Sequence, residues 1–224
     1  MPKLPLDHPK PLVYLITDRL SLRSTPKSRC AIRASLVEFI ERAFAAGVDI
    51  LQIRERDLPA REILSITEAA VRIARNSGGR VMVNDRADVA RCAGCGVHLT
   101  TRSIGIEAVK RAFGAEMMIG ASTHNLEEVV AAENAGADFV VFGPVFETSS
   151  KLSYGPPVGV ASLRAVARSV RIPVFALGGI TLANFHETLD AGAAGIAAIS
   201  LFARAADLER VIQTIKNFGN LASK

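Results

Sequence analysis

Gln52, Arg54 and Arg56 stand at alternate positions of a short polar stretch, and each carries a hydrogen-bond donor. Side chains of a β-strand point alternately to its two faces, so these three would share one face. An arginine that points into a fold needs an anionic partner, because burying its charge unpaired is costly. The stretch therefore predicts a site for phosphate or carboxylate, with a structural salt bridge such as Arg54 to Asp85 as the alternative.

An amide and a carboxylate stand side by side at Asn84 and Asp85. Mg2+ prefers oxygen ligands, takes few of them from a protein and keeps several of its waters. The pair is therefore a candidate site for a hydrated Mg2+ ion that is also bound to a substrate diphosphate.

His124 ends the segment 120–124, in which Ser122 supplies a hydroxyl group. Near pH 7 an imidazole accepts or donates a proton readily, so His124 is a candidate for proton transfer. A helix N-terminal position without a catalytic role explains the same histidine equally well. The segment is not the nucleophile elbow of a serine hydrolase, because His124 takes the place of the required glycine.

Gly178 and Gly179 follow an apolar run and precede Thr181 and a helical stretch. Glycines let backbone N–H groups and a helix N-terminus approach an anion closely. In α/β barrels the loops after strands seven and eight often bind phosphate. This layout predicts a phosphate-binding loop, and a plain tight turn is the alternative.

Eight short apolar runs would position these residues, at 13–17, 50–53, 81–83, 97–99, 118–122, 139–142, 174–177 and 195–199. They are continuous rather than alternating, which is typical of parallel strands covered on both faces. Helical periodicity separates them, most clearly over 35–46, 60–75, 126–135, 160–168 and 208–218. Glycines that would end a helix in the left-handed conformation precede four of the runs, at Gly47, Gly94, Gly136 and Gly192. The pattern predicts an α/β, single-domain (βα)8 TIM barrel, with an open doubly wound sheet as the alternative.

In such a barrel the loops that follow the strands carry the chemistry. The residues that end or follow the predicted strands are mostly small or polar, and they include Gln52, Arg54, Arg56, Asn84, Asp85, Ser122, His124, Thr148, Ser150, Lys151, Gly178, Gly179 and Ser200. We therefore expect the functional site at this end of the barrel.

The composition favours one compact domain over 1–224, with 1–11 as an N-terminal extension. With 224 residues, 49% hydrophobic and 22% charged, the chain can bury a large single core. The apolar runs are shorter than the ~20 residues of a membrane span, and the start lacks the layout of a secretory signal. A cytoplasmic protein without membrane contact is expected. The net charge of +5 favours anionic partners, but its cations are scattered, which argues against nucleic acid.

Two local features receive structural interpretations. The basic residues between Arg19 and Arg33 follow the first predicted strand and are interpreted as solvated loop charges, with a lid over bound phosphate as the alternative. Three cysteines are too few for a disulfide scaffold in a chain of this length. Cys92 and Cys95 have redox or zinc spacing, but a second pair is missing, so a structural role is expected.

Six motifs, in order over nearly the whole chain, resemble the thiamine-phosphate synthase and TenI family; they are Gln52 to Arg56, Asn84 to Asp85, Gly96 to Leu99, Gly120 to His124, Gly143 to Lys151, and Gly178 to Thr181. The synthase branch joins a pyrimidine-methyl diphosphate to a thiazole phosphate and releases pyrophosphate. The resemblance implies the same phosphorylated substrates and Mg2+ here.

The resemblance also assigns roles to single residues. It implies that Gln52, Arg54, Arg56, Asn84 and Lys151 bind the diphosphate, that Asp85 binds Mg2+, that Ser122 lies near the pyrimidine, and that Thr148, Ser150, Gly179 and Ser200 bind the thiazole phosphate. His124 has a counterpart in both branches of the family.

Two positions depart from the synthase pattern. Arg56 replaces a lysine, which keeps the charge but changes a point donor into a planar fork. Ser103 stands at about the place of a second acidic metal ligand. Both departures fit the TenI branch, which tautomerises a thiazole carboxylate phosphate with the histidine at the place of His124. Thiamine-phosphate synthase is the main prediction, and a TenI-like isomerase or a non-catalytic thiazole-phosphate-binding barrel are the alternatives.

Overall fold

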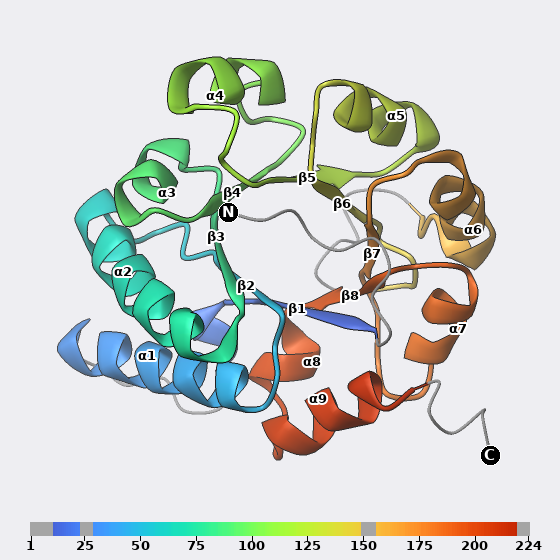
Figure 1. Cartoon of the computed structure of the whole chain (residues 1–224). Coiled ribbons are helices and arrows are strands. Elements are labelled where there is room, and N and C mark those ends of the chain that lie inside the picture. Colours follow the sequence, from blue (N-terminus) through green and yellow to red (C-terminus); the bar gives the residue numbers. More distant parts are fainter. Residues whose placement is uncertain (1–10, 23–28, 149–155, 219–224) are drawn as a thin grey trace.

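The eight apolar runs form one closed barrel of parallel strands. The structure, a computed structural model, describes residues 11–22, 29–148 and 156–218. Each strand pairs with its neighbour in chain order and β8 pairs with β1, so the sheet closes on itself (Figure 1). The strands are β1 (Leu12–Ile16), β2 (Ile50–Ile53), β3 (Arg80–Asn84), β4 (Gly96–Leu99), β5 (Ile119–Thr123), β6 (Phe139–Phe142), β7 (Val174–Leu177) and β8 (Gly195–Ala198). The barrel prediction is confirmed, and the doubly wound alternative is wrong because the sheet has no edge within the described chain.

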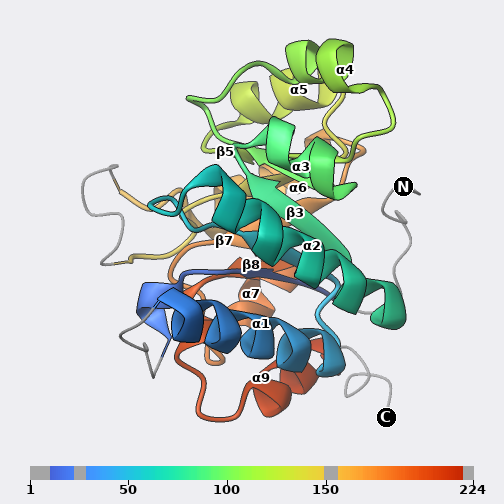
Figure 2. The same cartoon turned by 90° about the vertical axis from the view of Figure 1, so that its left-hand side faces the viewer.

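Helices surround the barrel in a ring, and Figure 2 shows them from the side. They are α1 (Arg29–Ala45), α2 (Ala60–Ser77), α3 (Ala87–Ala93), α4 (Ile106–Phe113), α5 (Leu126–Asn134), α6 (Gly159–Ser169), α7 (Phe185–Asp190), α8 (Ser200–Ala203) and α9 (Leu208–Lys216), with a 3-10 turn η1 (Arg19–Ser21) after β1. The five helices that the periodicity indicates most clearly are present. The shorter α3, α4 and α7 carry too few turns for a pattern that stands out.

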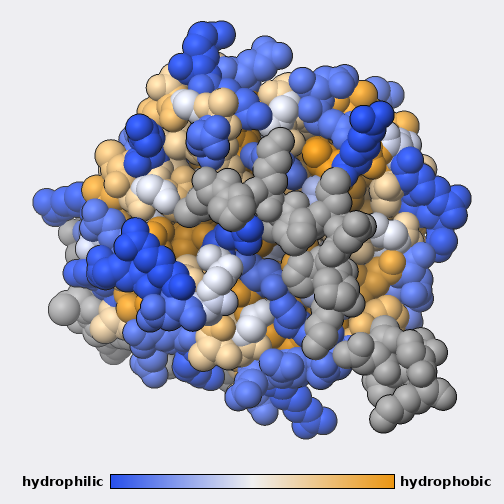
Figure 3. Space-filling view, in the orientation of Figure 1, coloured by the Kyte–Doolittle hydropathy of each residue, from blue (hydrophilic) through white to orange (hydrophobic). Residues whose placement is uncertain are grey.

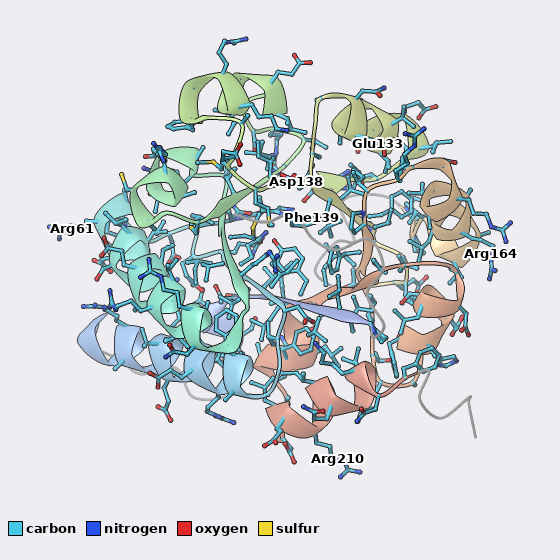
Figure 4. All side chains as sticks on the ribbon, viewed as in Figure 1. Arg61, Glu133, Asp138, Phe139, Arg164 and Arg210 are labelled. Carbon is cyan, nitrogen blue, oxygen red and sulfur yellow. The ribbon has the colours of Figure 1, made fainter. Side chains whose placement is uncertain are left out.

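Two apolar layers hold the fold together. One lies between the strands and the helices, and the other fills the barrel interior, where Tyr14, Phe139 and Phe175 pack edge to face at 5.4–5.6 Å between ring centroids. Gly120 makes room for this cluster, because a Cβ atom there would lie 2.3 Å from Phe139. In Figure 4 Phe139 lies inside the barrel, whereas Arg61, Arg164 and Arg210 point outward.

The described surface on the face shown in Figure 3 is mainly hydrophilic around its circumference. Figure 3 shows charged and polar side chains over the helices around the circumference, with apolar atoms between them. No helix in the described part of the chain is long and apolar enough to span a bilayer.

Candidate active site

A cavity of about 340 Å³ opens at the carboxyl ends of the strands. Every strand contributes a residue at its end or directly after it. The lining consists of Ile16, Asp18, Gln52, Arg54, Arg56, Asn84, His98, Thr100, Thr101, Arg102, Ser122, His124, Val141, Leu177 and Ile199. The site therefore lies at the end of the barrel that the sequence predicts.

The cavity has a cationic wall. Arg54, Arg56 and Arg102 line it, and Asp18 is the one acid among the described lining residues. An adjoining hollow of about 370 Å³ shares Arg56 and Arg102 with the cavity. Anions gain charge-assisted hydrogen bonds at such a surface. The alternation of Gln52, Arg54 and Arg56 thus places all three side chains at one cavity, as predicted.

A chain of four hydrogen-bonded side chains, the floor network, runs along and beneath the cavity floor; Gln52, His98 and Ser122 line the cavity, and Tyr14 lies under them. Gln52 Nε2 donates to the Tyr14 hydroxyl at 2.8 Å. That hydroxyl lies 3.1 Å from His98 Nδ1, and His98 Nε2 lies 2.9 Å from Ser122 Oγ. Gln52, Tyr14 and His98 are buried, and Ser122 is half-buried at the cavity wall. Four strands thereby share one polar network.

Burial controls the charge states within this network. Desolvation lowers the pKa of His98 to about 3, and the nearby Arg54 charge acts in the same direction. Desolvation also raises the pKa of Tyr14 well above its ordinary value, against a smaller opposing effect from Gln52. At neutral pH the imidazole is neutral and the phenol is protonated.

A second network fixes the loops that carry the arginines. Glu55 is 3% exposed and accepts from the Thr17 hydroxyl at 2.7 Å and from Arg19 Nη1 at 3.1 Å. The Arg54 N–H group donates to the same Thr17 hydroxyl oxygen at 3.0 Å. The acid of the 52–56 stretch is thus bound by Arg19, on the side away from the cavity.

Arg19 corrects one sequence interpretation. Its side chain is buried at 8% residue exposure and pairs with both Glu55 and Asp57, so it is not a solvated loop charge. The signal in the sequence was weak, because its acidic partners lie 36 and 38 positions away. Most of the remaining basic segment lies outside the described residues.

Asn84 and Asp85 end strand β3 as predicted and line the adjoining hollow together with Arg56. Asp85 has φ 63° and its N–H donates to the His98 carbonyl at 2.8 Å. No cluster of three metal-ligating side chains exists in the described part of the chain. One carboxylate and one amide oxygen fit a Mg2+ ion that takes its other ligands from substrate and water.

Ser103 does not replace the second acid. Its Oγ accepts from the Thr100 N–H at 2.8 Å and lies 3.0 Å from the Thr100 hydroxyl. The Ser103 side chain therefore closes its own loop after β4. The described lining of this hollow contains two carboxylates, Glu55 and Asp85. Glu55 is bound by Thr17 and Arg19, so Asp85 is the carboxylate that stands beside Asn84.

His124 is paired with Glu128. His124 Nδ1 lies 3.1 Å from Glu128 Oε2, and the His124 N–H donates to the same oxygen at 2.8 Å. Asn125 caps helix α5 by accepting from the Glu128 N–H, which fixes the acid in place. His124 thus lies at the cavity wall with Nδ1 directed to Glu128.

The β6–β8 side of the rim is built from backbone. Gly178 and Gly179 have φ values of 99° and 65°, which glycine adopts without strain. A Cβ atom on Gly178 would lie 2.5 Å from Pro144, and one on Gly179 would lie 2.4 Å from the Glu147 carbonyl oxygen. Among the described residues, no group accepts a hydrogen bond from the N–H of either glycine. Close packing of the loops requires both glycines, and it leaves their N–H groups for a ligand.

A helical stretch follows this glycine loop, as the sequence indicates. The Asn184 side chain accepts from the Thr181 N–H at 2.7 Å and donates to the Gly179 carbonyl at 3.0 Å. The α7 helix starts at Phe185, whose N–H donates to the Thr181 carbonyl at 3.1 Å, so one turn separates the helix from the glycines.

Two further predicted residues are described on this side. Ser200 directly follows Ile199 and is exposed at the start of α8. Thr148 is half-buried in the loop after β6. Ser150 and Lys151 lie outside the described residues.

Sequence reasoning missed Tyr14 and the function of His98 in the floor network. A signal existed for His98, because it alternates with Val97 and Leu99 in β4 and so points to the barrel interior.

Cys92 and Cys95 are free thiols; Cys92 is exposed and Cys95 is buried. Burial raises the pKa of the Cys95 thiol to about 12.

Comparisons with known proteins find relatives of one family over most of the chain. The family model described as thiamine monophosphate synthase matches residues 14–202. A putative thiamine-phosphate synthase of Geobacter sulfurreducens is 44% identical over 84% of each chain. Thiamine-phosphate synthase of a Roseiflexus species is 37% identical over 91% of this chain and 83% of its own. The solved thiamine phosphate pyrophosphorylase of Pyrococcus furiosus has a TM-score of 0.79 and 33% identity, over 92% of this chain and 94% of its own.

Proposed function

The chain belongs to the thiamine monophosphate synthase family, and we propose that it joins hydroxymethylpyrimidine diphosphate to thiazole phosphate with release of pyrophosphate. The observation that carries this proposal is one cavity with a cationic wall beside a polar floor that suits an aromatic heterocycle. This combination is what a transferase needs when its leaving group is a diphosphate.

Arg54 and Arg56 bind the diphosphate, together with Asn84 and Lys151. As the bond between the pyrimidine methylene and the diphosphate oxygen breaks, negative charge accumulates on the leaving group. Fixed cations and amide donors stabilise that charge without reorganising. Gln52 and His98 line the floor on which the pyrimidine lies, with Tyr14 beneath them and the Ser122 hydroxyl at the side.

Asp85 and Asn84 hold Mg2+. When bound, the ion would neutralise diphosphate oxygens. Because Ser103 faces its own loop, the protein supplies few ligands and the substrate supplies the rest. Arg56 lies between this site and the cavity and takes part of the charge-neutralising role.

The thiazole phosphate binds the β6–β8 side through the N–H groups of Gly178 and Gly179, with Thr148, Ser150 and Ser200 around it. This places the thiazole ring nitrogen toward the pyrimidine methylene carbon. Its lone pair forms the new carbon–nitrogen bond while pyrophosphate takes the electrons of the broken carbon–oxygen bond. Holding two reactants in this geometry removes much of the entropic barrier.

The test is a pyrophosphate-release assay with each substrate alone and with both, in the presence and absence of Mg2+. We expect release that needs both substrates and Mg2+, and we expect Asp85→Asn to raise the Mg2+ concentration needed by about tenfold. Release at the level of the single-substrate controls overturns the proposal.

The isomerase alternative can be tested on the same protein. It is a specific alternative because the His124 imidazole is paired with the Glu128 carboxylate, an arrangement suited to proton transfer. Metal-independent aromatisation of a thiazole carboxylate phosphate, lost in His124→Ala, would support the isomerase. We expect none above background.

A further inference from the structure

The floor network has a defined direction of hydrogen bonding. Gln52 Nε2 donates to the Tyr14 hydroxyl oxygen at 2.8 Å. A phenol has a single proton, so with its oxygen accepting from Gln52 that proton is directed to its other partner, His98 Nδ1 at 3.1 Å. Nδ1 then accepts, and the imidazole proton must lie on Nε2.

The opposite tautomer fits poorly. A proton on Nδ1 would direct two donors at the Tyr14 oxygen and leave the phenolic proton without an acceptor among the described neighbours. Tyr14 is 0% exposed, so water cannot satisfy that proton. A buried donor without a partner is costly.

The direction continues to the cavity. With its proton on Nε2, His98 donates to Ser122 Oγ at 2.9 Å. Ser122 Oγ uses one of its two lone pairs for this bond, and its own proton is available to the cavity that Ser122 lines. Gln52, Tyr14 and His98 therefore determine what Ser122 offers to a ligand.

We propose that Tyr14 and His98 are positioning residues that direct the Ser122 hydroxyl proton into the cavity, so that a bound ring with an unprotonated acceptor atom there is favoured. The inference deepens the proposed function and rests on it for the identity of the ring. An aminopyrimidine has such acceptors in its ring nitrogens. A ring with a C–H group at that place leaves the Ser122 proton without an acceptor.

The first test is independent of catalysis. Long-range 1H–15N NMR spectra of the ligand-free protein, labelled with 15N-histidine and assigned by loss of the signal in His98→Gln, report which His98 nitrogen carries the proton. We expect a protonated Nε2 and a bare Nδ1. A proton on Nδ1 overturns the proposal, whether or not the protein is a synthase.

The second test is kinetic. Tyr14→Phe removes one hydroxyl and keeps the ring that packs on Phe139 and Phe175. We expect the KM for the pyrimidine diphosphate to rise about tenfold while the KM for thiazole phosphate changes less than about twofold, as for loss of one well-aligned hydrogen bond. An equal rise in both KM values would show a merely structural role and overturn the proposal.

Thr123→Val is the matched control. Thr123 is a buried neighbour of Ser122 whose hydroxyl donates to the Val141 carbonyl at 3.3 Å, outside the chain of four. Its loss should leave both KM values unchanged. A rise in the pyrimidine KM equal to that of Tyr14→Phe would assign the effect to local packing instead.

A double-mutant cycle completes the test. Because Tyr14 acts through Ser122, Tyr14→Phe should add nothing in a Ser122→Ala background. Additive effects overturn the proposal. If the wild-type protein releases no pyrophosphate, the proposed function is refuted but this inference is not. The NMR measurement still decides the direction of the hydrogen bonds in the floor network.

Discussion

The two sides of the rim are built differently. On the β1–β5 side, side chains from distant strands meet in a hydrogen-bonded floor beneath a wall of arginines. On the β6–β8 side, glycines bring two loops into contact, and their N–H groups have no acceptor among the described residues. The β1–β5 side depends on the chemistry of its polar side chains, whereas the β6–β8 side depends on glycines, which have no side chain.

Because of this difference, we expect the two sides to respond differently to substitutions. Exchanging a polar side chain on the β1–β5 side removes one interaction and leaves the loop path intact. Adding a single Cβ atom on the β6–β8 side forces the backbone of two loops apart, since close-packed interiors do not yield locally. We expect the largest effects on the glycine side.

Gly179→Ala should have the largest effect. The new methyl group would lie 2.4 Å from the Glu147 carbonyl oxygen, and the residue would have to keep a left-handed backbone conformation. We therefore expect the unfolding free energy to fall by about 3 kcal/mol. We also expect weaker binding of thiazole phosphate. Urea unfolding and calorimetry measure both. Gly94→Ala is the control, with a similar φ of 68° and no atom within 4 Å, and should lose about 1 kcal/mol. Equal losses would show that loop contact contributes nothing.

Arg54→Ala should have the second largest effect, which we expect on the rate of pyrophosphate release. Loss of a charge-assisted contact to the leaving diphosphate should lower kcat/KM by about 100-fold, which corresponds to ~2.7 kcal/mol. Initial rates of pyrophosphate release give this value. Arg61→Ala, on the outer face of α2 in Figure 4, should leave the rate unchanged. A loss below about fivefold would exclude Arg54 from diphosphate binding.

His98 should make stability depend on pH. Its pKa is lowered to about 3 in the folded protein, against about 6.5 when unfolded, so the unfolded chain binds a proton first as the pH falls. Stability is present above pH 6.5 and is lost toward pH 3. Between pH 7 and 5 we expect the wild type to lose about 2 kcal/mol more than His98→Gln in urea unfolding. Parallel pH profiles would contradict a neutral buried imidazole.

Ser103→Asp should have the smallest effect. The new carboxylate would accept from the Thr100 N–H in place of the serine oxygen, and so would stay in its own loop. We expect the Mg2+ concentration for half-maximal rate to change less than about threefold, or ~0.7 kcal/mol. A tenfold decrease would show that position 103 reaches the ion.

The sequence by itself determined the barrel and much of its functional rim. Continuous apolar runs, glycine turns and the alternation of Gln52, Arg54 and Arg56 are local patterns of period two or 3.6, and local patterns are readable without partners. They place Asn84, Asp85 and Ser122 correctly at strand ends. The motifs also indicated the family, although they assign no geometry.

Only the tertiary structure decided which polar groups meet. Tyr14 and His98 are 84 positions apart, Arg19 and Glu55 are 36 apart, and no local period connects either pair. Ser103 turns back to Thr100, so a position that aligns with a metal ligand serves its own loop. Closing the barrel pairs β8 with β1 and faces β1 toward β4 across the interior, and this closure creates the directional floor beneath Ser122.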